Sequence, residues 1–154
     1  MKWYKIFTPT TIVKLISYWP PLFFSGISVR EFDLEKCYVR ARLKTRFFNK
    51  NYFGTHYGGS LYSLCDPFFA FIFLHHLGKD FIIWDKAAKI DFIAATKDPV
   101  YAYFSISKEE IARVRKEAQK KSKVEPVYQV DITDIEGKII ARVEKTLYIR
   151  KKCR

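Results

Sequence analysis

The segment from Gly58 to Gly78 limits the fold more than any other part of the sequence, because it is apolar on nearly every side. Its only acidic residue is Asp66, which is followed directly by Pro67. A helix without a polar face stays soluble only where other structure encloses it. We therefore predict a long apolar helix over this segment, wrapped by a curved β-sheet.

Segments on both sides of the helix alternate between apolar and polar residues, which is the two-residue period of a half-buried strand. These segments are residues 27–32, 37–47, 81–84, 86–94, 100–106, 127–133 and 139–149. The turn residues at 134–137 predict a hairpin loop between the last two. The sequence thus predicts an α+β fold with a largely antiparallel sheet of five or six strands.

The alternation is strict in residues 37–47, and the two faces of this strand differ in charge. The face predicted to point inward consists of Cys37, Val39, Ala41, Leu43 and Phe47. The outer face consists of Tyr38, Arg40, Arg42, Lys44 and Arg46. Arg40 and Arg42 are candidates for binding phosphate groups, and the alternative is an ordinary solvated face.

Helix signals lie near both ends of the chain. Thr8 and Pro9 are typical of a helix start, and Pro20 is predicted to end this first helix. The apolar face of the first helix is predicted to consist of Ile12, Leu15, Ile16 and Trp19. We favour packing of this face on the body of the protein over a role as a membrane-surface anchor. A basic helix is predicted after Ser107, where Glu110 completes a capping-box pattern.

No repeat or linker divides the 154 residues, so we predict an N-terminal helical extension over residues 1–25 and a single domain over 26–154. Lys and Arg exceed Asp and Glu by 28 to 16, which favours an anionic partner. The sequence lacks the motifs of nucleic-acid-binding proteins, so nucleic acid is not the predicted partner. The spacing of Cys37, Cys65 and Cys153 does not match a metal site and indicates a reducing, cytoplasmic location.

A glycine motif precedes the apolar helix. Gly58 and Gly59 are followed at fixed spacing by Leu64 and Asp66, and the preceding residues 51–57 read Asn-Tyr-Phe-Gly-Thr-His-Tyr. With the predicted helix and curved sheet, this pattern resembles the hotdog-fold thioesterase superfamily. It is similar to the phenylacetic-acid-degradation type, except that Tyr57 stands where that type has a histidine. The sequence is more similar still to an uncharacterised bacterial branch of the superfamily.

The resemblance implies an acyl thioester of coenzyme A or of an acyl carrier as substrate. It implies hydrolysis by activated water without a metal or other cofactor. It also implies a homodimer or a dimer of dimers, because hotdog sites are built between subunits. A non-catalytic protein that binds acyl groups or lipids, with contact to a membrane surface, is the alternative.

Four residues are candidates for catalysis. Gly59 at a helix start offers a backbone N–H to a developing oxyanion, although the two glycines also suit a tight turn. The resemblance implies that Asp66 is a general base, whereas its position before Pro67 also suits a helix cap. His56 and Asn51 are candidates for positioning the substrate or the water.

Five residues are candidates for binding the substrate. Tyr57, Gly58 and Phe69 are assigned to the acyl thioester, and Phe69 is equally suited to the core. Arg40 and Arg42 are assigned to the phosphates of coenzyme A.

Overall fold

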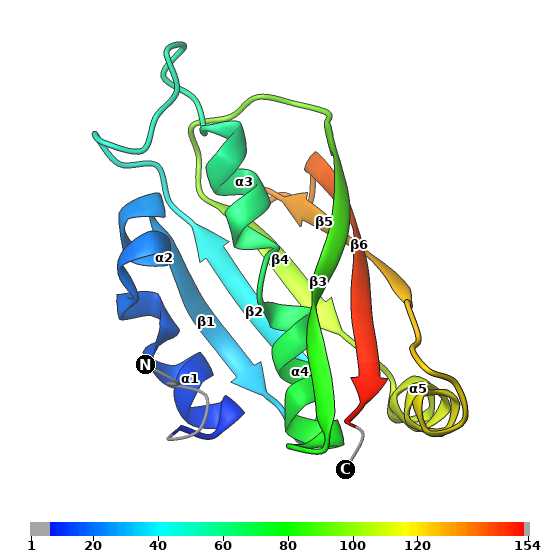
Figure 1. The fold of residues 1–154 in the computed structure, drawn as a ribbon. Helices are drawn as coiled ribbons and strands as arrows, with labels where there is room; N and C mark the ends of the chain where they lie inside the picture. The colour runs from blue at the N-terminus through cyan, green and yellow to red at the C-terminus, as the bar shows by residue number, and fades with distance from the viewer. Residues whose placement is uncertain (1–6, 153–154) are drawn as a thin grey trace.

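The computed structural model describes residues 7–152 and contains a curved antiparallel sheet of six strands (Figure 1). The order across the sheet is β1-β2-β4-β5-β6-β3, so β1 and β3 are the two edges. The strands are β1 (Ile27–Asp33), β2 (Tyr38–Leu43), β3 (Phe81–Phe92), β4 (Val100–Ser105), β5 (Val127–Thr133) and β6 (Ile139–Lys151). The predicted α+β architecture, with six antiparallel strands, is confirmed.

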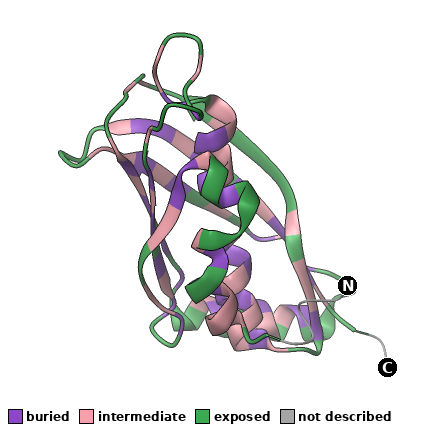
Figure 2. Cartoon of the chain, turned by 90° about the vertical axis from the view of Figure 1, so that its left-hand side faces the viewer, coloured by how far each residue is buried: buried purple, intermediate pink, exposed green. Residues whose placement is uncertain are grey.

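The apolar segment lies on the concave side of the sheet, as predicted, but it forms two helices (Figure 2). These are α3 (Gly58–Leu64) and α4 (Phe68–Leu77). The break follows from Pro67, which has no N–H to continue the ladder of helical bonds. Before it, the N–H of Asp66 donates to the carbonyl of Ser63 over 3.3 Å, which closes α3 with a tighter turn. The predicted apolar helix is therefore present but divided at this joint.

Edge strand β3 joins two segments, residues 81–84 and 86–94, that the sequence pattern predicts as separate strands. Asp85 pairs with Leu147 of β6 and Ala87 pairs with Thr146, so Lys86 is an extra residue in a β-bulge. The bulge shifts the alternation by one position. Because odd-numbered residues face the core before it and even-numbered residues after it, the sequence pattern looks interrupted although the strand continues.

Strand β2 is shorter than predicted. It ends at Leu43, and Phe47 is 94% exposed in the loop that follows, so the prediction that Phe47 points inward is wrong. The loop turns against Gly26, whose carbonyl accepts the N–H of Lys44 over 3.0 Å. Gly26 has a φ of +81°, and a Cβ atom there would lie 2.4 Å from the carbonyl oxygen of Lys44. Only glycine allows this approach.

The N-terminal residues form α1 (Pro9–Leu15), a short 3₁₀ helix, η2 (Ile16–Tyr18), and α2 (Pro20–Ser25). Thr8 caps α1, because its side chain accepts the N–H of Thr11 over 3.2 Å. Pro20 begins α2 instead of ending the helical region, since proline is well tolerated in the first turn.

The N-terminal helices pack along β1. The Oγ atom of Ser17 accepts the N–H of Val29 over 2.9 Å, and Val13 and Ile16 are buried. Leu15 and Trp19 are more than half exposed, so the predicted apolar face of the first helix is only partly correct. Within residues 7–152, no helix is both long and apolar enough to cross a membrane.

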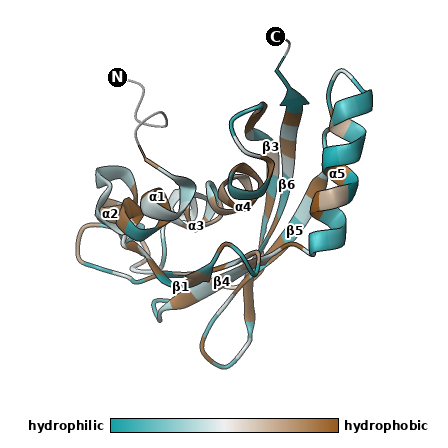
Figure 3. Ribbon diagram, turned by 90° about the horizontal axis from the view of Figure 1, so that it is seen from below, coloured by the Kyte–Doolittle hydropathy of each residue, from teal (hydrophilic) through white to brown (hydrophobic). Residues whose placement is uncertain are grey.

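Helix α5 (Lys108–Lys120) packs beside β6 and presents a largely hydrophilic outer surface (Figure 3). Its buried residues are Ile111, Val114 and Ala118. Ser107 caps the helix by accepting the N–H of Glu110 over 3.1 Å. The reciprocal half of the predicted capping box does not form, because the carboxylate of Glu110 accepts bonds from Arg113 and Tyr128.

Candidate active site

A cleft of about 380 Å³ opens beside the start of α3. Its walls are the loop before α3, the end of β3 and the segment that follows β3. The cleft brings together three of the candidate residues, Asn51, His56 and Gly58. The remaining lining is mainly apolar and includes Leu61, Phe92, Ile93, Ala94, Ala95 and Ile140.

The two glycines at the start of α3 lie close to aromatic rings. A Cβ atom on Gly58 would lie 3.0 Å from the ring of Phe92, and one on Gly59 would lie 2.4 Å from the ring of Tyr57. Tyr57 thus covers Gly59 and is itself 59% exposed. As the first two residues of α3, Gly58 and Gly59 have N–H groups without an intrahelical acceptor.

Asn51 organises the loop that leads to these glycines. Its side-chain amide donates to Oγ1 of Thr55 over 2.8 Å and to the carbonyl of His56 over 3.1 Å. Its side-chain oxygen accepts the N–H groups of Phe53 and Thr55, each over 3.0 Å. With both ends of the amide occupied, Asn51 shapes one wall of the cleft.

His56 is buried and joins the same loop to the segment after β3. Its Nε2 atom donates to the carbonyl of Asp98 over 2.8 Å, and Oγ1 of Thr45 lies 3.2 Å from the ring nitrogens. Burial lowers the pKa of His56, partly opposed by the carbonyl and the charge of Asp98. The imidazole is therefore neutral at pH 7, and in this arrangement it supports the cleft wall.

Asp66 lies at the joint between α3 and α4, about 10 Å from Gly59, the length of one seven-residue helix. Its side chain is 52% exposed. It does not cap α4, which begins without a side-chain capping bond. Instead, Nζ of Lys145 donates to Oδ1 of Asp66 over 3.4 Å.

Lys145 is fully buried and belongs to a cluster of polar side chains beneath this joint. Its Nζ atom lies 3.5 Å from Oδ1 of Asp85 and donates to the hydroxyl of Tyr62 over 3.4 Å. It also lies 5.0 Å from the centre of the Tyr62 ring, within the range of a cation–π contact. We call Asp66, Asp85, Lys145 and Tyr62 the lysine cluster.

Burial and neighbouring charges shift the pKa values of Asp85 and Lys145 in opposite directions. Burial raises the pKa of Asp85 to about 6, against the lowering influence of Lys145. Burial lowers the pKa of Lys145, but the charges of Asp85 and Asp66 outweigh it, so the net shift is upward. Oδ1 of Asp85 makes no hydrogen bond with good geometry, so its contact with the lysine is mainly electrostatic. Lys145 is thus a cation at neutral pH and not a nucleophile.

Sequence reasoning missed Lys145 and Asp85. The signal was present, because Lys145 interrupts the inward row of β6 between Val143 and Leu147. A lysine at an inward position requires an acidic partner. Asp85 was hidden by the bulge that follows it, which obscures the side of β3 that it faces.

Phe69 is part of the core. Its ring lies 5.2 Å from that of Phe104 and 5.4 Å from that of Tyr128, and the residue is 2% exposed. This arrangement matches the core alternative for Phe69 and places it away from the cleft.

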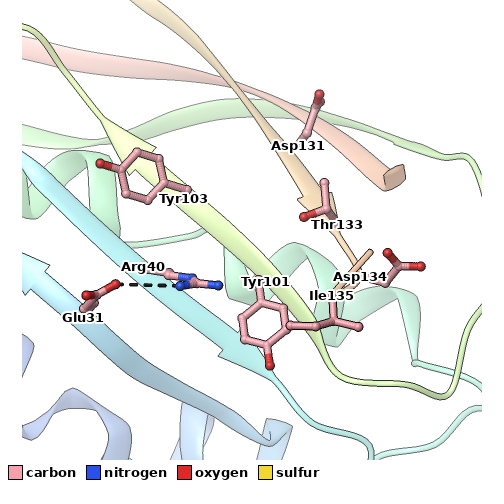
Figure 4. A pocket seen from close by; sticks show the side chains of 8 residues that line it. All are labelled: Glu31, Arg40, Tyr101, Tyr103, Asp131, Thr133, Asp134 and Ile135. Atoms are coloured by element: carbon pink, nitrogen blue, oxygen red, sulfur yellow. Dashed lines mark ion pairs between the residues drawn. The ribbon is translucent and has the colours of Figure 1, made fainter. Parts of the chain in front are cut away.

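Arg40 lies on the outer face of the sheet, on the opposite side from α3 and α4 (Figure 4). It lines a second pocket of about 500 Å³, where it pairs with Glu31 over 3.8 Å and lies 5.1 Å from the Tyr101 ring centre. Arg42 points to the same face. The structure therefore does not bring Arg40 and Arg42 together with the glycine motif.

The cysteines within the described residues, Cys37 and Cys65, are buried free thiols. Burial raises the pKa of both thiols, so neither is an activated nucleophile. Cys153 lies outside the described residues. In residues 7–152, no three His, Cys, Asp or Glu side chains are placed to hold a metal ion.

Comparison with known proteins gives one family and several similar structures. The model of DUF4442, a domain of unknown function, matches residues 11–149. A Pseudomonas aeruginosa protein of unknown function, described as "Probable Thioesterase", aligns with a TM-score of 0.80 and 23% identity, covering 94% of this chain and 97% of its own. None of the curated proteins matches.

Two further structures show the same fold. A thioesterase from Haemophilus influenzae aligns with a TM-score of 0.67 and 16% identity, covering 98% of this chain and 96% of its own. A hypothetical thioesterase from Streptococcus pneumoniae, solved with coenzyme A, aligns with a TM-score of 0.58 and 18% identity, covering 83% and 88%. At these identities the similarity establishes the fold.

Proposed function

Because the chain belongs to the DUF4442 family and has the hotdog fold, we propose that it is an acyl thioesterase that hydrolyses its substrate with activated water. The observation that carries the proposal is Asp66, a half-exposed carboxylate held at its Oδ1 atom by a buried cation. A general base needs both access to water and a fixed position, and this arrangement supplies both.

The proposal includes a homodimer formed through β3. This strand is an edge of the sheet and exposes apolar side chains at Trp84 and Phe92. An exposed, apolar edge strand is a ready template for pairing with another strand. We infer that β3 of one copy pairs antiparallel with β3 of a second copy.

Such pairing would complete the site. In one chain, Asp85 of the lysine cluster lies in the first half of β3, whereas Phe92, which contacts Gly58, is its last residue. An antiparallel pair places the first half of one strand beside the second half of the other. Asp66 of one copy would thereby approach the cleft and the Gly58–Gly59 turn of the other.

The reaction then proceeds in two steps. Water attacks the thioester carbonyl while Asp66 accepts one of its protons, and the N–H of Gly59 stabilises the negative oxygen of the tetrahedral intermediate. The intermediate then expels the thiolate, and Asp66 returns the proton to sulfur. The products are a carboxylic acid and a thiol, and no metal or redox group takes part in these steps.

The cleft supports an acyl substrate, because Leu61, Ile93 and Ile140 give it apolar walls. The Streptococcus pneumoniae structure with coenzyme A supports coenzyme A as the thiol carrier. An acyl-coenzyme A substrate would place the protein in the cytoplasm, where free thiols such as those of Cys37 and Cys65 persist.

The direct test is the release of free thiol from a panel of acyl-coenzyme A esters of increasing chain length. We expect turnover above the uncatalysed rate for at least one ester, with release of the matching acid. The thioether analogue of the best substrate, which cannot be hydrolysed, should compete with it. Binding of the analogue without turnover of any ester would contradict the enzymatic proposal and identify an acyl-binding protein.

The dimer has its own test in light scattering after size-exclusion chromatography. We expect a mass twice the 18.3 kDa of one chain. Replacing Ala88, near the centre of β3, by Glu should shift the protein to the monomer, because two like charges would face each other across the new strand pair. The matched control is Ala112→Glu on the exposed face of α5, which should remain dimeric. A monomeric wild-type protein, or a dimeric Ala88 variant, would contradict pairing through β3.

A further inference from the structure

Helix α2 lies beside the loop that follows β2, at the β1 end of the molecule (Figure 1). Exposed aromatic side chains gather on these two segments. Phe24 and Phe48 meet at 6.2 Å between ring centres, and Phe23 packs against Phe24 at 5.4 Å. Phe47 is next to Phe48 and is 94% exposed. We call Phe23, Phe24, Phe47 and Phe48 the aromatic surface.

Hydrogen bonds hold together the two segments that carry the aromatic surface. The side-chain amide of Asn49 donates to the carbonyl of Ser25 over 2.8 Å and to that of Lys44 over 3.0 Å. Asn49 is 7% exposed, and its side-chain oxygen accepts the N–H of Arg46. The fold therefore holds these phenylalanines outward from a fixed base.

Basic side chains lie beside the aromatic surface, and the two segments that carry it contain no acidic residue. The guanidinium of Arg46 lies 5.3 Å from the Phe23 ring centre and 6.0 Å from that of Phe48. Lys44 and Lys50 are exposed on the same loop. The sequence from residue 1 to 30 and from 36 to 65 contains no Asp or Glu. The surface is thus apolar and positively charged at once.

We propose that the aromatic surface docks the protein on an anionic phospholipid membrane. Aromatic rings are favoured at the level of the lipid headgroups, and Arg and Lys beside them are attracted to anionic lipid. This proposal rests on the proposed dimer, which uses β3 at the opposite end of the strand order and leaves the aromatic surface accessible.

The loop that carries part of the aromatic surface continues to the wall of the cleft. The loop continues from Lys50 into Tyr52 and Phe53, which are 98% and 85% exposed. The base of this loop, at Asn51 and Thr55, lines the cleft. A protein held on a membrane by these rings would have its cleft near the lipid surface, where long-chain acyl groups concentrate.

The test measures binding to vesicles by co-sedimentation and does not depend on hydrolysis. Vesicles of phosphatidylcholine alone are compared with vesicles in which about one third of the lipid is phosphatidylglycerol. We expect the wild-type protein to bind the anionic vesicles and to be released by high salt in part. Phe24→Ser/Phe47→Ser should weaken binding by about tenfold or more, because both side chains are exposed and contribute little to the core.

Charge is tested separately at Arg46. The variant Arg46→Glu should weaken binding by about tenfold or more. The matched control Lys116→Glu makes the same charge change on the exposed face of α5 and should alter binding by less than about threefold. Hydrolysis of a soluble short-chain substrate should be unchanged in the docking variants, so a failure of docking is separable from a failure of the proposed enzyme.

Three results would overturn the proposal. The first is no binding of the wild-type protein to anionic vesicles. The second is equal loss for Arg46→Glu and Lys116→Glu, which would indicate attraction by the overall charge alone. The third is a lower oligomeric mass for Phe24→Ser/Phe47→Ser with unchanged vesicle binding, which would assign the surface to another copy of the chain.

Discussion

Replacing Asp66 by Asn is expected to lower kcat/KM for thioester hydrolysis by about 10²- to 10⁴-fold, the usual contribution of a general base. An amide has nearly the shape of the carboxylate but cannot accept the proton of the attacking water. Because Asp66 is 52% exposed and its ion pair with Lys145 spans 3.4 Å, the fold should be retained. The rate of thiol release measures the loss of activity, and the midpoint of thermal unfolding, measured on the same preparation, shows whether the fold is retained.

The matched control is Asp80→Asn, the same chemical change at an exposed aspartate between α4 and β3. Its kcat/KM should stay within about twofold of the wild-type value. If Asp66→Asn also keeps that activity, Asp66 is not the base. The carboxylate would then serve only as the exposed partner of Lys145.

Replacing Lys145 by Met is expected to lower the free energy of unfolding by about 3 kcal/mol at pH 8, and by less at pH 5. The variant leaves Asp85 buried without the cation that opposes its raised pKa, so that pKa rises above about 6. A raised pKa means that the folded state keeps a proton that the unfolded state has released. Stability therefore falls as the pH increases from about 4 through the folded-state pKa.

Urea unfolding followed by circular dichroism, at one protein concentration and at both pH values, measures this loss. Lys116→Met, on the exposed face of α5, is the control and should change stability by less than about 0.5 kcal/mol. The double variant Lys145→Met/Asp85→Asn removes the titrating group and should lose most of the pH dependence. A loss for Lys145→Met that is equal at pH 5 and pH 8 would contradict the role assigned to Asp85.

The sequence was sufficient to predict the sheet, because strand alternation and an all-round apolar helix are direct consequences of burial. It failed where the backbone departs from a regular period. Pro67 divides the apolar helix, and Lys86 adds one residue to β3. Pro20, a common stop signal, instead starts a new helix, since the same residue suits a first turn.

The candidate site was predicted less completely than the fold. The loop from Asn51 to Gly58 was found from its motif, and the structure gathers Asn51, His56 and Gly58 at one cleft. Lys145 and Asp85 could not be assigned from spacing, because 60 residues of sequence separate two side chains that lie 3.5 Å apart. Such pairs depend on strand order, which a single sequence does not specify.

The bulge in β3 changes which residues of the strand face the core. Every side chain after Lys86 is displaced by one position relative to the pattern set by Ile83 and Asp85. Adding one further residue there, without a second bulge, would turn Ile90 and Phe92 to the other side of the sheet. The spacing between Asp85 and Phe92 is therefore constrained as well as their identity, so chains that share the lysine cluster and the glycine turn should tolerate substitution along β3 far better than the insertion of a residue.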